Sequence, residues 1–261
     1  MQVTKATEMG QKSKQEDFLL DVEINIPFVS QGSGRLLAVM DGHLGSKTAE
    51  TVCGTLRETF EKKIRSLEGE GFEKVLEQTI DDLSRKTINL LSGTTLSMVF
   101  LPKDESCAHI GVLGDSPVVV LDADGQVRKS PLHLAGYHFD DRVAAIKKGA
   151  DYSNTSRFIS FNGYALKLTR TLGDSPLSSV INRNPDVYTV DLNEKSIVLL
   201  GSDGLLGQVP IEKEFYSRWA ERMIEWASQG DDADRLVSTA LDDLKSRDNT
   251  SAILVKLDFW N

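Results

Sequence analysis

Positive charge, cysteine and long apolar runs are all scarce in this chain of 261 residues. Lysine and arginine together number 30 against 39 acidic residues, which leaves a net charge of −9. A phosphate backbone would repel such a chain, so we expect no nucleic-acid partner. No apolar run approaches the length of a membrane span, and the polar N-terminal stretch lacks the apolar block of a signal peptide. We therefore expect no membrane partner.

Only two cysteines are present, Cys53 and Cys107. They lack the spacing of zinc ligands and are too few for a disulfide framework. Cys53 falls on the apolar face of an expected helix, which is typical of a core thiol. This use of cysteine is typical of a reducing compartment, so we expect a cytoplasmic or nuclear location.

Hydrophobic residues make up 40% of the chain and charged residues 26%, as in soluble globular proteins. The periodic patterns run in the order strands, two helices, strands, an irregular segment, strands, two helices and a strand. Short links between strands predict an α+β fold with two mostly antiparallel sheets, packed on each other and flanked by helix pairs. We find no linker and expect one domain over residues 1–261. The irregular segment, residues 131–170, is expected to be a functional flap and is called the flap below.

The stretch beginning at Leu36 joins an expected strand to a polar turn. Residues 36–40 form an apolar run with the length of a buried strand. It ends in Asp41, Gly42 and His43. Glycine lets the backbone approach a bound ion, and histidine can transfer protons near neutral pH. A purely structural interpretation stays open here, because polar residues are common in strand-to-helix turns.

Other acidic residues share the setting of Asp41, an acid at a strand edge beside a turn: Glu16, Asp115, Asp203 and Asp248. Carboxylate ligands suit Mg²⁺ or Mn²⁺ rather than zinc. Several carboxylates in one cavity repel one another, and divalent cations are the usual remedy. Two such ions could activate water and clamp a phosphoryl group. Each acid alone is equally well explained as a turn or capping residue, and the pattern does not itself bring them together.

At this point the sequence resembles the metal-dependent Ser/Thr protein phosphatases of type 2C. The matching motifs occur in the family's order across almost the whole chain, at residues 16–17, 39–43, 92–95, 113–116, 168–174, 201–205 and 246–250. They include an acidic pair, an Asp-Gly-His core, a Ser-Gly-Thr-Thr strand start and a Gly-Asp-Ser turn. Each motif is weak alone, but the ordered set is specific.

The resemblance implies a four-layer α-β-β-α sandwich with two Mg²⁺ or Mn²⁺ ions at one end. It implies that Asp41 bridges both ions and that Gly42 contributes its carbonyl oxygen. Glu16 would serve one ion, and Asp203 and Asp248 the other. A water bridging the ions would attack the phosphorus directly. His43 matches the general acid that protonates the leaving serine or threonine oxygen, unless it is a turn histidine bonded to the backbone.

Three departures from the family pattern indicate a divergent member. Lys12 stands where the family has an arginine that grips phosphate, and it keeps the charge but loses the bidentate fork. Gly207 replaces an acid that, with the counterparts of Asp115 and Asp203, helps to hold a third ion. A third ion at Asp115 is therefore in doubt. The flap also begins with a degraded form of the family motif, at residues 131–134.

We therefore expect a monomeric phosphatase that removes phosphate from phosphoserine and phosphothreonine in protein substrates. The alternative is a catalytically weak or silent relative, a scaffold that binds protein partners through the same fold. Lys12, Gly207 and the altered flap favour the scaffold, whereas the intact acids oppose it. An aspartyl-nucleophile phosphatase is set aside, because His43 stands where that class needs a second aspartate.

Overall fold

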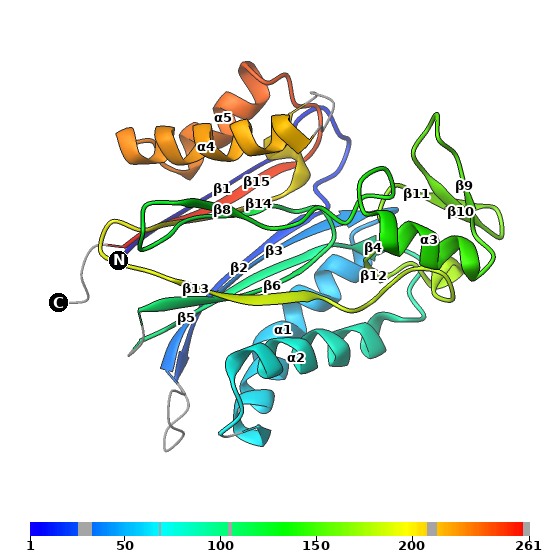
Figure 1. Cartoon of the computed structure of the whole chain (residues 1–261), viewed down its shortest axis with the longest axis horizontal. Helices are drawn as coiled ribbons and strands as arrows, with labels where there is room; N and C mark the ends of the chain where they lie inside the picture. Colours follow the sequence, from blue (N-terminus) through cyan, green and yellow to red (C-terminus); the bar gives the residue numbers. More distant parts are fainter. Residues whose placement is uncertain (26–32, 68, 104–105, 208–212, 258–261) are drawn as a thin grey trace.

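The structure is a computed structural model that describes residues 1–25, 33–67, 69–103, 106–207 and 213–257. Two β-sheets pack face to face, and a helix pair covers the outer face of each (Figure 1). The pairs are α1 (Lys47–Ser66) with α2 (Phe72–Thr87), and α4 (Lys213–Gln229) with α5 (Ala233–Asp242). The prediction of an α+β fold in four α-β-β-α layers is confirmed.

The sheet beneath α4 and α5 joins the two ends of the chain. Its strands lie in the order β1 (Gln2–Glu8), β15 (Thr250–Lys256), β14 (Ile197–Gly201), β7 (Val118–Leu121) and β8 (Val127–Lys129). Each neighbouring pair is antiparallel. The first and last strands of the described chain are therefore hydrogen-bonded partners, which brings the loops that follow β1 and precede β15 to the same end.

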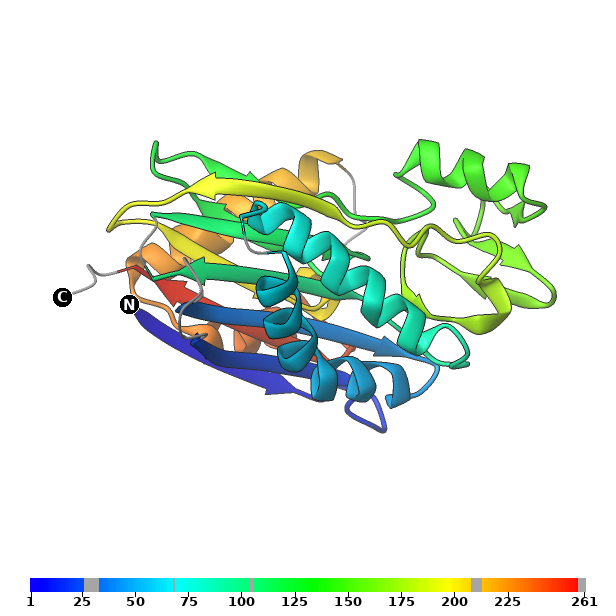
Figure 2. The ribbon, with the colours of Figure 1, turned by 90° about the horizontal axis from the view of Figure 1, so that it is seen from below.

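The second sheet is covered by α1 and α2 (Figure 2). Its strands lie in the order β12 (Leu172–Gly173), β4 (Gly93–Thr94), β3 (Ser33–His43), β5 (Leu96–Pro102), β6 (Cys107–Leu113) and β13 (Asp186–Asp191), and β2 (Asp17–Asn25) also pairs with β3. These pairs are antiparallel too. The start of β2 consequently lies beside the end of β3.

Strand β3 is buried on both faces, which explains its continuous apolar run. Alternate residues point to opposite sides of a sheet. Leu36, Ala38 and Met40 therefore pack toward α1 and α2, and Leu37 and Val39 pack against the other sheet. All five side chains are fully buried. The strand is thus held on both sides, and the residues at its end inherit that rigidity.

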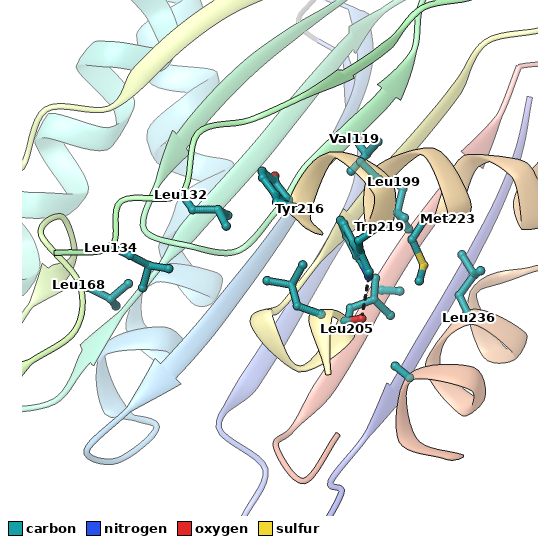
Figure 3. Close-up of a cluster of buried hydrophobic side chains, with 14 of the residues drawn as sticks. Val119, Leu132, Leu134, Leu168, Leu199, Leu205, Tyr216, Trp219, Met223 and Leu236 are labelled. Atoms are coloured by element: carbon teal, nitrogen blue, oxygen red, sulfur yellow. Dashed lines mark hydrogen bonds between the residues drawn. The ribbon is translucent and has the colours of Figure 1, made fainter. Parts of the chain in front are cut away.

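A separate apolar cluster lies between the first sheet and the pair α4 and α5 (Figure 3). Trp219 is buried in it and donates its indole N–H to the carbonyl oxygen of Leu205 at 3.1 Å. Leu205 and Leu206 belong to the 3₁₀ helix η2 (Asp203–Leu206) and are buried as well. The cluster therefore anchors the turn that begins at Asp203.

The flap lies at one end of the sheets, near β4 and β12, and is more regular than expected (Figures 1 and 2). It contains α3 (Phe139–Lys147) and an antiparallel sheet of β9 (Asp151–Tyr152), β10 (Ile159–Phe161) and β11 (Tyr164–Leu166). A short 3₁₀ helix, η1 (Ser175–Leu177), follows β12. No described helix has both the length and the apolar character needed to cross a membrane.

Candidate active site

Strand pairing brings the first acidic pair to the end of β3. In the antiparallel register of β2 and β3, Asp17 lies opposite Asp41. Glu16 reaches the same end through its backbone, because its carbonyl oxygen accepts the N–H of Gly42 at 3.2 Å. A Cβ on residue 42 would lie 2.5 Å from that oxygen, so only glycine permits this approach. The loop before β2 is therefore closed onto the Asp-Gly-His turn.

The other sheet contributes its acids to the same end. Asp203 follows the end of β14, and Asp248 precedes β15, its antiparallel partner. The backbone N–H of Asp203 donates to Asp41 Oδ2 at 3.3 Å. Asn249 binds the opposite loop, since its side-chain oxygen accepts the N–H of Glu16 at 2.8 Å. Residues more than 150 positions apart thus meet where the two sheets come together.

Asp115 is held beside Asp41 by a hydroxyl bridge. Thr95 Oγ1 accepts the N–H of Asp41 at 3.0 Å and lies 2.6 Å from Ser116 Oγ. Asp115 itself follows Gly114, whose φ of +118° and close contact with Thr95 leave no room for a side chain. This turn places a buried carboxylate against the same cluster.

The clustered carboxylates carry negative charge that the surrounding protein offsets only in part. Burial raises the pKa of Asp41, Asp115 and Asp203, and neighbouring carboxylate charges raise each further. Burial likewise raises the pKa of Asp17 to about 7, although hydrogen bonds from Ser251 and Ser202 lower it. Asp17 Oδ1 is buried without a hydrogen-bond partner. Hard oxygen donors with such mutual repulsion fit divalent cations such as Mg²⁺ or Mn²⁺.

Lys12 lies at this cluster and pairs with one of its acids. Its ammonium group is 2.7 Å from Asp248 Oδ1. Burial lowers the pKa of Lys12, but the hydrogen bond and the charge of Asp248 outweigh it and raise the pKa overall. The side chain is about half exposed. Lys12 is therefore a charged group at the rim of the cluster, accessible from solvent.

His43 is held by an aspartate that sequence reasoning did not select. Asp174 Oδ2 accepts the Nε2–H of His43 at 2.8 Å and the hydroxyl of Thr171 at 2.6 Å. Asp174 has a positive φ of 48° and is almost fully buried. Gly93 lies against this pair, since a Cβ there would be 2.1 Å from His43 Nε2. The contact between His43 and Asp174 argues against a histidine that merely bonds its own turn.

The flap is tied to the Asp115 turn through His133. Its N–H donates to the carbonyl oxygen of Gly114, and its Nδ1 accepts the N–H of the same glycine, both at 3.0 Å. His133, His138 and Asp186 lie close enough to hold a cation. However, a neutral His133 that accepts at Nδ1 keeps its proton on Nε2, which donates to Asp186 at 3.1 Å. We therefore interpret this cluster as a structural link between flap and sheet.

The structure thus brings most of the expected residues together and adds others. The residues with side chains in or against the cluster are Lys12, Asp41, Asp115, Asp203 and Asp248, while Glu16 and Gly42 join through their backbones. Sequence reasoning did not select three of these as site residues, namely Asp17, Asp174 and Asn249, although Asp17 was recognised as part of the first acidic pair. Their signal was their place inside three of the recognised motifs, where more prominent neighbours drew attention.

Comparison with known proteins agrees with this geometry. A family model described as Protein phosphatase 2C matches residues 3–242. Protein phosphatase fem-2 of Caenorhabditis elegans is 28% identical over 219 residues, covering 79% of this chain and 47% of the relative. The chain therefore spans about half the length of that relative.

Two solved Toxoplasma gondii structures share the fold. One, described as a serine-threonine phosphatase 2C, has a TM-score of 0.75 at 16% identity. The match covers 97% of this chain and 93% of the chain in that structure. The other, described as a phosphatase from a pathogenic strain, has a TM-score of 0.77 at 20% identity. The match covers 98% of this chain and 92% of the chain in that structure. Identities this low establish a common fold alone.

Proposed function

The chain belongs to the protein phosphatase 2C family, and from this premise we propose that it hydrolyses phosphoserine and phosphothreonine in proteins. One observation carries the proposal. Asp41, Asp115 and Asp203 lie together at one end of the β-sandwich, with Asp115 buried and the other two partly buried. The charges of neighbouring carboxylates raise the pKa of each beyond the effect of burial. A purely structural end of a sheet has no reason to concentrate so much negative charge.

Two Mg²⁺ or Mn²⁺ ions fit the oxygen donors of this cluster. We assign Asp41 to both ions, and Glu16 with the carbonyl oxygen of Gly42 to one of them. Asp203 and Asp248 are assigned to the other, and Asp115 lies where a third ion would bind. When bound, such ions lower the pKa of water and neutralise phosphate charge.

Lys12 and His43 act on the substrate itself in this proposal. The ammonium group of Lys12 attracts the phosphate dianion and orients it at the rim of the cluster. Asp174 holds His43 through Nε2, so the imidazolium form of His43 would give its Nδ1 proton to the leaving serine or threonine oxygen and become a neutral imidazole. Asp174 is a positioning residue, because it acts through the imidazole and not on the ester.

The test is phosphate release from a phosphothreonine peptide by the purified protein with Mn²⁺, and its loss on adding EDTA. Asp203→Asn should bind Mn²⁺ more weakly and lose activity by about 100-fold or more. Asp191→Asn, which makes the same change at an exposed position at the end of β13, serves as the control.

A fully active Asp203→Asn protein would contradict the assignment of this residue. An unaltered protein that binds no Mn²⁺ at millimolar concentration would instead favour the scaffold alternative. Calorimetric titration distinguishes these cases, because it reads metal binding without needing a substrate.

A further inference from the structure

Position 207 holds a glycine where the type 2C pattern has an acid that helps to hold a third ion. Gly207 ends the η2 turn with a φ of +74°, a conformation that side-chain-bearing residues adopt rarely. A Cβ there would lie 2.6 Å from the Cβ of Leu244 and 2.7 Å from its carbonyl oxygen. The backbone therefore leaves no room for a carboxylate side chain at position 207.

Lys167 is carried toward this side by the flap. The carbonyl oxygen of Lys167 accepts the N–H of Ala135 at 2.7 Å, and Leu168 forms a β-bridge with Leu134. His133, just before that bridge, exchanges two hydrogen bonds with Gly114. Consecutive hydrogen-bonded segments thus connect the Asp115 turn to the backbone of Lys167.

The Lys167 side chain is exposed and has a nearby aromatic ring. Its ammonium nitrogen lies 5.6 Å from the centroid of the Phe158 ring, which also belongs to the flap. Its charge acts on the cluster as well. Burial and neighbouring acids raise the pKa of Asp115 and Asp203, and the positive charge of Lys167 opposes that rise at both. The positive charge of Lys167 thus offsets part of the negative charge of Asp115 and Asp203.

Formal charge also favours a fixed cation here. The acids assigned to the proposed metal centre, with Asp17 opposite Asp41, are Glu16, Asp17, Asp41, Asp115, Asp203 and Asp248. When all of these acids are ionised, their combined negative charge is balanced by the positive charge of two divalent ions and the ammonium groups of Lys12 and Lys167. A third divalent ion would add a positive excess that this balance does not require.

We propose that Lys167 is a tethered cation that takes the place of a third divalent ion beside Asp115 and Asp203. The inference rests on the proposed metal centre and deepens it. A lysine is suited to this, because its compact charge stands on a flexible four-carbon stem that can adjust to the positions of the carboxylates. The centre then holds two ions, and the flap is drawn to it by charge rather than by a shared metal ligand.

Mn²⁺ titration by calorimetry, without substrate, tests the proposal. Lys167→Gln removes the competing charge, so Mn²⁺ should bind more tightly, on the order of three- to tenfold, and an additional weak equivalent should appear. Lys167→Glu should strengthen both effects. Lys167→Arg keeps the charge and should bind Mn²⁺ as the unaltered protein does.

Lys147→Gln is the matched control, because Lys147 is an exposed lysine on α3 of the same flap. Its isotherm should overlay that of the unaltered protein. If the Lys167→Gln isotherm also overlays it, the inference is wrong, even if the unaltered protein releases phosphate. If the isotherm shifts as expected while the unaltered protein releases no phosphate, the proposed phosphatase activity fails and the role of Lys167 stands.

Discussion

Replacing Asp17 by asparagine should stabilise the metal-free protein at alkaline pH. Asp17 is buried, pairs across the strands with Asp41 and carries an oxygen with no hydrogen-bond partner. Its pKa is raised from an ordinary value of 3.8 to about 7, chiefly by burial. Asparagine has the same shape without the charge, and it can still accept the Ser251 hydroxyl that Asp17 Oδ2 accepts at 2.8 Å.

The size of the effect follows from the pKa shift. A difference of about three pKa units corresponds to about 4 kcal/mol between the charged and neutral forms. Because neighbouring acids titrate together with Asp17, we expect a gain of about 2–4 kcal/mol in the free energy of unfolding. For a chain of this length that gain corresponds to roughly 5–10 °C in Tm.

The sign of the pH dependence is also defined. The folded protein holds the Asp17 proton more tightly than the unfolded chain does. The unaltered protein therefore keeps this contribution to stability below about pH 4 and loses it as the pH rises through about 7. The advantage of Asp17→Asn should be largest at about pH 8 and small at about pH 4. Saturating Mn²⁺ should also reduce it, because bound cations offset the repulsion.

Urea denaturation in EDTA, followed by circular dichroism at both pH values, measures these differences. Asp191→Asn, at an exposed site, should leave the free energy of unfolding nearly unchanged. An Asp17→Asn protein no more stable than the unaltered one at about pH 8 would refute the argument that carboxylate burial strains the metal-free fold.

Two further predictions concern the general acid and the core. Asp174→Asn should lower kcat for a phosphothreonine peptide by about 10²-fold or more, yet affect p-nitrophenyl phosphate little, because nitrophenolate leaves without a proton. Steady-state assays of both substrates check this, and an equal loss on both would contradict it. Leu37→Ala should cost about 2–5 kcal/mol of unfolding free energy, because Leu37 is fully buried between the sheets. Thermal denaturation measures it, and an unchanged Tm would show that the sheets repack.

Local patterns were enough to predict the elements and their layers. The apolar run at residues 36–40 proved to be the buried centre of β3. The helical periodicities matched α1, α2, α4 and α5, although residues 208–212 before α4 lie outside the described chain. Such patterns suffice because each reports which side of an element is buried, a property set by residues adjacent in sequence. The flap was less predictable, because its short strands are defined mainly by pairing within a small separate sheet.

The sequence by itself determined which chemistry this protein can host. The acids, the glycine and histidine beside Asp41, and the lysine at position 12 were all identifiable from residue type and motif order. Only the tertiary structure decided that Asp203 touches Asp41, that Asp174 holds His43 and that the flap links the backbone of Lys167 to the turn before Asp115. The physical reason is distance along the chain. Strand pairing and sheet stacking create these contacts between residues far apart in sequence, and no local pattern encodes them.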